Sequence, residues 1–176
     1  MKVVFLDIDG VMNHYVSHEE YESHSVDQMD IYDEHLSLLS RIIDETNAEI
    51  VLTSSWRVFP NTLSTVMDRL ASFGMRLRGI TDEGVDRVTL KSLTDVKQVR
   101  LSWNDVGRVD DRGAEILLWS YKHRNALERA VVLDDETKDI EPYLKDNIFL
   151  IKTDYAFGLT KELADKAIRM LNGEEE

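Results

Sequence analysis

Short apolar segments alternate with amphipathic segments along this chain. Five apolar, β-branched runs have the length of buried strands and lie at residues 3–6, 49–53, 75–80, 130–133 and 148–152. Apolar residues at three- and four-residue spacing predict helices near 33–46, 61–73 and 112–123 and after Thr160. Strands that are apolar throughout and alternate with such helices are typical of a parallel sheet covered on both faces. The pattern predicts an α/β fold: a three-layer, doubly wound, mostly parallel sheet.

Signals at the helix ends support these assignments. Asn61 and Thr160 carry side chains that cap the first turn of a helix, and Gly74 is a typical stop after the second one. Residues 88–94 and 96–103 (VTLKSLT and VKQVRLSW) are predicted as two short strands, a hairpin beside the sheet.

The composition narrows the class of protein. The 176 residues are 43% hydrophobic and 31% charged, which predicts one globular domain over residues 1–176. No run approaches the roughly 20 apolar residues of a membrane span, and the start of the chain is unlike a signal peptide, which predicts a cytoplasmic protein. The absence of cysteine excludes disulfides and thiolate sites. A net charge of −13 argues against an extended nucleic-acid groove.

The first predicted strand ends in two aspartates, in the sequence MKVVFLDIDGVMN. Residues two apart on an extended chain point to the same side, so Asp7 and Asp9 share one small volume, and Gly10 lets the chain turn after them. Two carboxylates so close cannot both ionise freely unless a cation intervenes, so their pKa values separate. This suits an ionised nucleophile beside a protonated acid.

Polar groups also follow two other predicted strands. TSSWR (53–57) follows the second strand, and DDETKD (134–139) follows the fourth. Ligands of parallel sheets bind beyond the carboxyl ends of the strands. Hydroxyls, an arginine and carboxylates are therefore expected to meet Asp7 and Asp9 at one edge.

The stretch FLDIDGV resembles the first motif of the haloacid dehalogenase (HAD) superfamily. There the first aspartate is the nucleophile that forms an aspartyl-phosphate. The second aspartate is the general acid and base, and its backbone carbonyl binds Mg²⁺. The resemblance implies these roles for Asp7 and Asp9, with Asp7 also a Mg²⁺ ligand.

The later motifs of the superfamily have counterparts in the same order. The hydroxyl motif matches Thr53, with Ser54 as the close second and Ser55 third. The late acidic motif implies that Asp134 and Asp135 bind Mg²⁺. Asp139 also has a fitting spacing, although it is expected to begin a short helix.

The basic residue that neutralises the phosphate has no obvious signature here. Arg112 lies at the expected distance before Asp134, and Lys91 and Lys122 are the alternatives. Arg57 is a further candidate for phosphate binding, because it follows the hydroxyl motif closely. It either steers an anionic substrate or pairs with a surface carboxylate.

A closer resemblance is to the compact HAD domains associated with RNA-repair proteins and their stand-alone relatives. The matching stretches are FLDIDGVMN, LTSSWR, RGAEI, VLDD and GLT (158–160), which together span nearly the whole chain. About 43 residues separate Asp9 from Thr53, which leaves little room for a cap domain. Residues 13–30 and 81–111 are the candidates for partial lids over an open site.

The predicted function is that of a Mg²⁺-dependent phosphatase that hydrolyses phosphate monoesters through an aspartyl-phosphate. A phosphorylated small molecule, a nucleotide or an oligonucleotide end all remain open as substrate, as does the oligomeric state. Two alternatives stand beside this one. The first is a receiver-like signalling domain that keeps its phosphoryl group, and the second is a catalytically inactive binding module of the same fold.

Histidines and tryptophans are weaker signals. His14, His18 and His24 lie in one polar stretch without the spacing of a zinc motif, so they are interpreted as solvated. Trp56, Trp103 and Trp119 are interpreted as core residues rather than base-stacking platforms. Trp56 is the exception to test, because it lies beside the hydroxyl motif.

Overall fold

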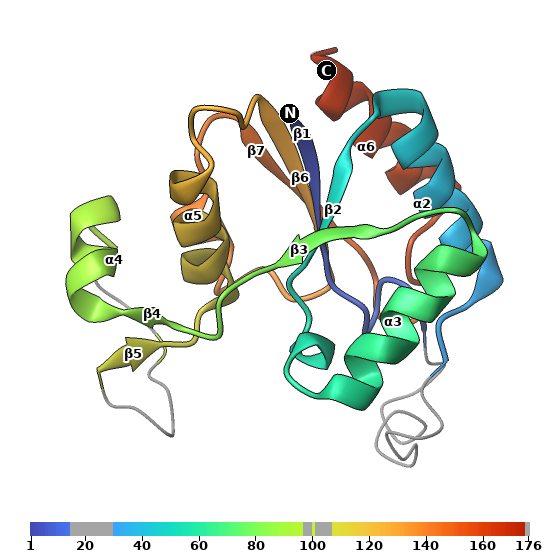
Figure 1. The fold of residues 1–176 in the computed structure, drawn as a ribbon. Helices are drawn as coiled ribbons and strands as arrows, with labels where there is room; N and C mark the ends of the chain where they lie inside the picture. The colour runs from blue at the N-terminus through green and yellow to red at the C-terminus, as the bar shows by residue number, and fades with distance from the viewer. Residues whose placement is uncertain (15–29, 97–99, 101–106, 175–176) are drawn as a thin grey trace.

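The computed structural model describes residues 1–14, 30–96, 100 and 107–174. Its centre is a sheet of five parallel strands in the order β3-β2-β1-β6-β7 (Figure 1). The strands are β1 (Lys2–Leu6), β2 (Glu49–Leu52), β3 (Leu77–Ile80), β6 (Arg129–Asp134) and β7 (Ile148–Lys152). All five predicted strands are confirmed, with ends that differ by at most two residues.

Helices cover both faces of this sheet (Figure 1). The helices α2 (Asp33–Thr46), α3 (Pro60–Ser72) and α6 (Lys161–Asn172) lie on one face, and α5 (Arg112–Lys122) lies on the other. The predicted three-layer α/β fold is therefore confirmed, and the described residues contain no cap domain.

The two cores arise from the alternation of side chains along each strand. In β1, Val4 and Leu6 pack into the core beneath α2, α3 and α6, whereas Val3 and Phe5 pack beneath α5. The ring of Phe5 meets Trp119 edge to face, with 5.3 Å between ring centroids. Trp119 is thus the core residue that was predicted. Burial on both faces explains why the strands are apolar throughout.

The ends of the helices follow local capping rules, with one correction. The side chain of Thr160 accepts a hydrogen bond from the backbone N–H of Leu163 and caps α6 as predicted. Gly74 follows the end of α3, also as predicted. The prediction that Asn61 caps α3 is wrong. Pro60 already occupies the first helical position, where its fixed φ and missing N–H are favourable, so the helix begins one residue earlier.

The described residues between 81 and 111 form a small unit beside the sheet. Strands β4 (Val85–Asp86) and β5 (Arg108–Val109) pair antiparallel, and α4 (Arg87–Leu93) follows β4 directly. The prediction of a strand over 88–94 is wrong. The carboxylate of Asp86 accepts hydrogen bonds from the first free amides of α4 and so starts a helix there.

Two segments with predicted structures or roles lie mainly outside the described residues. Of the predicted strand at 96–103, only residues 96 and 100 are described, and of the stretch 13–30 only 13, 14 and 30. The roles of residues 13–30 and 81–111 as partial lids, and the single domain over 1–176, stay predictions. Two short 3-10 helices, η2 (Ser55–Arg57) and η3 (Glu141–Tyr143), complete the described elements. None of the described helices combines the length and the apolar character that crossing a membrane requires.

Candidate active site

Strands β1 and β6 lie side by side and end at the same level. Leu6 pairs with Leu133, and the backbone N–H of Asp7 donates to the carbonyl of Leu133. This register places the side chains at the carboxyl ends of the two strands at one edge of the sheet. Asp7, Asp134 and Asp135 each offer a carboxylate oxygen there, all within 4.8 Å of one another. The structure thus brings together three of the carboxylates predicted to bind Mg²⁺.

Gly10 lets the turn after β1 lie close against this cluster. Its φ of +67° belongs to the left-handed region, which residues with a side chain rarely adopt. A Cβ atom at position 10 would lie only 2.7 Å from Cγ of Asp135. The backbone of Gly10 is further held by the hydroxyl of Thr153, which donates to its carbonyl oxygen at 2.7 Å.

Arg112 is the counter-charge of the cluster. Its Nη1 lies 2.8 Å from Oδ2 of Asp7 and 2.5 Å from Oδ2 of Asp134. Both carboxylates are buried, with 4% and 0% of their surface exposed, so they depend on this partner more than a surface pair would. Burial lowers the pKa of Arg112, but the charges of Asp7 and Asp134 together outweigh it and raise the pKa, so the guanidinium stays charged. The second oxygen of Asp7, Oδ1, has no hydrogen-bond partner among the described residues.

The start of α5 explains why Arg112 points into the site. The backbone N–H groups of Arg112 and Gly113 donate to the side chain and to the carbonyl of Asp139, respectively. Asp139 therefore fixes the first turn of α5. The prediction that it begins a short helix is wrong by two residues, because η3 begins at Glu141 with Ile140 before it. Asp139 is not one of the three clustered carboxylates, so its alternative assignment as a metal ligand finds no support.

Asp9 lies beside the cluster with both carboxylate oxygens engaged. The indole N–H of Trp56 donates to Oδ2 at 2.9 Å, and the side-chain amide of Asn13 donates to Oδ1 at 3.0 Å. Burial is the largest influence and raises the pKa of Asp9, and the charge of Asp7 adds to it. The donors on Asn13 and Trp56 act in the opposite direction. The side chain of Asp9 is therefore oriented by two donors, and its pKa is raised above the ordinary value of an aspartate.

The three hydroxyls after β2 have different surroundings. Thr53 is fully buried, and its hydroxyl has no hydrogen-bond partner among the residues that the structure describes. The hydroxyl of Ser54 accepts a bond from the backbone N–H of Trp56 and so caps η2. Ser55, ranked third from the sequence, lines the cavity beside Asp7. Ser55 therefore presents its hydroxyl to the cavity, whereas the hydroxyl of Thr53 is buried and that of Ser54 is used within the chain.

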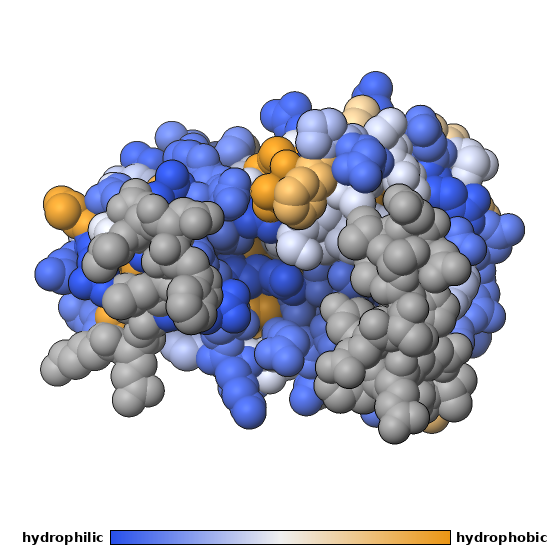
Figure 2. Space-filling model, turned by 90° about the horizontal axis from the view of Figure 1, so that it is seen from below, coloured by the Kyte–Doolittle hydropathy of each residue, from blue (hydrophilic) through white to orange (hydrophobic). Residues whose placement is uncertain are grey.

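A cavity of about 440 Å³ opens over these groups at the carboxyl ends of the strands. Figure 2 views this side of the molecule and shows mainly hydrophilic residues around the hollow. The lining residues are Asp7, Asp9, Gly10, Ser55, Arg112, Asp135, Glu136 and Tyr155. Glu136 and Tyr155 were not predicted, although each follows the end of a strand, which was the signal that could have found them.

Arg57 does not face this cavity, contrary to its prediction as a phosphate-binding residue. All five of its N–H donors are used within the chain. Four bonds go to the backbone carbonyls of residues 53, 54, 81 and 82, and the fifth goes to the buried carboxylate of Glu115 at 2.7 Å. Burial raises the pKa of Glu115 to about 7, which Arg57 partly offsets. Arg57 therefore holds the loop of the hydroxyl motif in place.

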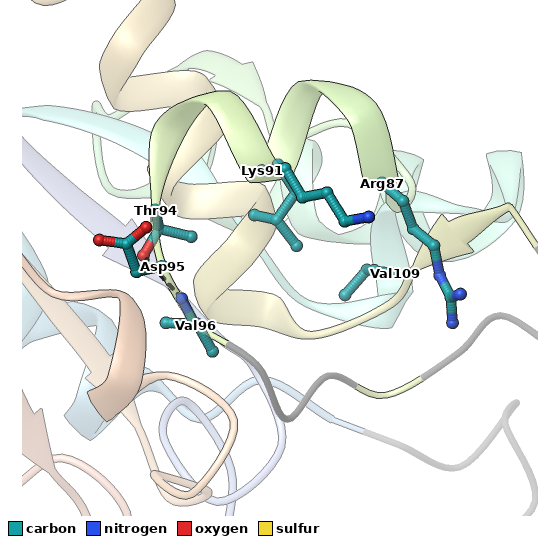
Figure 3. Close-up of a pocket in the computed structure, with 7 residues that line it drawn as sticks. Arg87, Lys91, Thr94, Asp95, Val96 and Val109 are labelled. Atoms are coloured by element: carbon teal, nitrogen blue, oxygen red, sulfur yellow. Dashed lines mark hydrogen bonds between the residues drawn. The ribbon is translucent and has the colours of Figure 1, made fainter.

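The alternatives to Arg112 also lie elsewhere. Lys122 pairs with Asp82 at the surface, at 2.6 Å. Lys91 lines a separate cavity of about 400 Å³ on α4 and β5. Figure 3 shows Lys91 and Arg87 extending from α4 at that cavity, near Val109. Of the three basic residues proposed for this role from the sequence, Arg112 is the one in contact with the carboxylate cluster.

A comparison with protein-family models identifies the family. Residues 3–164 match the model described as the HAD domain in Swiss Army Knife RNA repair proteins. The chain belongs to this family. Membership indicates a hydrolase of the phosphatase type, as the resemblance of the sequence motifs implied. A search among curated proteins found none that matches the chain.

HAD domains usually use Mg²⁺, and the residues of this HAD domain fit that ion. Mg²⁺ prefers oxygen ligands and is commonly held by one or two carboxylates. The cluster offers three carboxylates, including an oxygen of Asp7 that lacks a partner within the described chain. Burial and the charge of Asp7 raise the pKa of Asp135 to about 6 and also raise that of Asp134. A divalent cation would relieve this repulsion.

Trp56 of the HAD domain is expected to set the pH range in which Asp9 is protonated. Trp56→Phe removes the indole N–H, which favours the ionised form of Asp9, and keeps an aromatic side chain. The pKa of Asp9 then rises, and the alkaline limb of kcat/KM moves to higher pH. A shift of roughly one pH unit corresponds to one hydrogen bond of about 1.4 kcal/mol. The measurement is the pH profile of phosphate release, which reports the pKa values of the free enzyme.

Trp119→Phe is the matched control for this prediction. Trp119 lies in the core beneath α5, whereas the described donors to the carboxylate of Asp9 are Trp56 and Asn13. The alkaline limb of the pH profile should therefore not move in Trp119→Phe. An alkaline limb at the same pH in Trp56→Phe and in the wild-type protein would contradict protonated Asp9 as the acid.

Proposed function

We propose that this HAD domain is a Mg²⁺-dependent phosphatase that hydrolyses phosphate monoesters through an aspartyl-phosphate on Asp7. The observation that carries the proposal is the environment of Asp7. Arg112 contacts one oxygen of the Asp7 carboxylate, the second oxygen has no partner in the described part of the chain, and the carboxyl group of Asp9 lines the same cavity. A nucleophile, a proton donor and a fixed positive charge are thus within one small volume.

In the first step, a carboxylate oxygen of Asp7 attacks the phosphorus atom. The bond from phosphorus to the leaving oxygen breaks, and Asp9 transfers its proton to that oxygen. Arg112 neutralises the charge of Asp7 and Asp134 and so lowers the repulsion that an approaching phosphate meets. The hydroxyl of Ser55 is proposed to bind a phosphoryl oxygen.

In the second step, the ionised Asp9 takes a proton from water, and the oxygen of that water attacks the phosphorus of the aspartyl-phosphate. The acyl phosphate bond breaks, phosphate leaves, and both aspartates return to their starting states. Asp7, Asp134, Asp135 and the backbone carbonyl of Asp9 are proposed to hold Mg²⁺, which would neutralise the phosphate and the carboxylates together.

The substrate is proposed to be a nucleotide, the phosphorylated end of an oligonucleotide or another small phosphomonoester. The described residues contain no cap domain over the cavity, which leaves access for the end of a large molecule. The family is named for RNA repair proteins, which favours a nucleic-acid end. The net charge of −13 disfavours a long nucleic-acid interface and is compatible with a short terminus.

The test is phosphate release from four substrate classes, each with Mg²⁺ and with a chelator. The classes are nucleotides, 5′- and 3′-phosphorylated oligonucleotides, sugar phosphates and phosphopeptides. We expect turnover that requires Mg²⁺ and prefers one class. A stable phosphoryl group on the protein after reaction with a small phosphate donor, without turnover, would instead indicate the receiver-like alternative. Stabilisation by Mg²⁺ without turnover of any class would indicate a binding module.

A further inference from the structure

A second group of metal-ligating side chains lies at the start of α2, apart from the three aspartates. It consists of His14, Glu34 and His35. Nδ1 of His14 lies 3.0 Å from Nε2 of His35, and Oε1 of Glu34 lies 3.8 Å from each of these two nitrogens. A point equidistant from these three atoms lies about 2.1 Å from each, the usual length of a bond from zinc to nitrogen or oxygen. The spacing of the three atoms therefore matches the size of such an ion.

The ring of His35 is fixed in an orientation that suits a ligand. The residue is only 3% exposed, and its Nδ1 lies 2.9 Å from the carbonyl oxygen of Leu159. A carbonyl can only accept, so Nδ1 carries the hydrogen and Nε2 presents its lone pair to His14 and Glu34. Gly158 leaves room for the ring, because a Cβ atom there would lie 2.7 Å from Nε2. The backbone around the ring is thus shaped to hold it in this position.

The donors of this cluster differ from those of the predicted Mg²⁺ site. Mg²⁺ prefers oxygen ligands alone, whereas imidazole nitrogen selects zinc and related transition metals. Two histidines with one glutamate form a known type of zinc ligand set, with the fourth position left for water. We propose that His14, Glu34 and His35 form a second metal site, which binds Zn²⁺ and is distinct from the carboxylate cluster.

Zinc would occupy the position of the hydrogen that lies between the two imidazole nitrogens. Because Nε2 of His35 accepts, the hydrogen between the two nitrogens is assigned to Nδ1 of His14, 3.0 Å away, and the two rings meet edge-on at 81°. Zinc binding moves the hydrogen of His14 to its other ring nitrogen, and both imidazoles stay neutral. The side chains of His14 and Glu34 are 30% and 67% exposed, so they have space to turn toward the ion.

The experiment is a calorimetric titration of the untagged protein with Zn²⁺ in the presence of excess Mg²⁺. A chelator that competes for Zn²⁺ brings the affinity into the measurable range. We expect one Zn²⁺ per chain. His14→Ala should weaken binding by at least about 100-fold, because even groups that only orient a metal ligand contribute roughly 10–100-fold. Glu34→Gln should weaken it in the same direction. Both side chains are partly exposed, so these variants test the site without removing the buried ring of His35.

Two control variants distinguish this site from other side chains of the protein that could bind Zn²⁺. His123→Ala removes a histidine that stacks on Trp119, and Asp134→Asn alters the carboxylate cluster. Neither change should affect the zinc isotherm. Absence of stoichiometric Zn²⁺ binding at micromolar concentrations would overturn the proposal, as would equal affinities in His14→Ala and the wild-type protein. The titration does not depend on phosphatase activity, so its failure would leave the proposed function intact.

Discussion

Asp7→Asn is expected to lower kcat for phosphate-monoester hydrolysis by at least about 10⁴-fold, the scale on which an enzyme depends on its nucleophile. The amide is uncharged and a poor nucleophile, so the aspartyl-phosphate cannot form. Asparagine has nearly the same shape as aspartate, and the fold around β1 should persist. The measurement is steady-state phosphate release in Mg²⁺ with the substrate that the wild-type protein prefers.

Asp68→Asn is a matched control for this effect. Asp68 is an exposed aspartate on α3, and its replacement should leave kcat unchanged. Thermal denaturation of both variants checks that each is folded. Folded Asp7→Asn that kept more than about 1% of the wild-type turnover would contradict the proposed mechanism. The increase in activation free energy would then be under about 3 kcal/mol, which is too small for the loss of a nucleophile.

Arg112→Met is expected to have the second largest effect, a loss of roughly 10³–10⁵-fold in kcat, as found for arginines that stabilise phosphoryl transfer. Methionine keeps much of the side-chain volume and removes the charge that lies against Asp7 and Asp134. The two carboxylates then repel each other, so Mg²⁺ should raise the melting temperature more in this variant than in the wild-type protein. Phosphate release and melting curves with and without Mg²⁺ measure the two effects.

Arg112→Lys tests the geometry of the same contact. Lysine restores the charge but cannot reproduce the planar fork of the guanidinium, so it should recover only part of the activity. Arg41→Met, which removes a surface ion pair with Asp165, serves as the control and should behave like the wild-type protein. An unchanged kcat in Arg112→Met would remove Arg112 from the mechanism.

The sheet could be predicted from the sequence because its strands are buried on both faces. Segments such as 3–6 and 130–133 are apolar at every position, which distinguishes them from the amphipathic helices between them. Residues 88–94 were wrongly predicted as a strand because their alternating apolar residues fit a strand as well as a short helix. The capping carboxylate of Asp86 favours the helix, and Asp86 lies just before residues 88–94.

The candidate site could be predicted as far as it depends on strand ends. Asp7 follows β1 and Asp134 ends the neighbouring strand β6, so parallel register alone brings them together. The contacts of Trp56 and Asn13 with Asp9 depend on the path of two turns, which no periodicity reports. The role of Arg57 was also beyond the sequence, because its partners are mostly backbone carbonyls, and every residue has one.

The bonds of Arg57 and Glu115 have a consequence for how this domain can vary. They join the segment after β3 to the hydroxyl loop and to α5, and Glu115 also accepts the backbone N–H of Gly84 at 2.7 Å. The unit that begins at Val85 therefore leaves the body of the protein from an anchored base. Its buried residues pack on α5 and are constrained, whereas its exposed positions can change and offer new substrate contacts while the geometry around Asp7 is preserved.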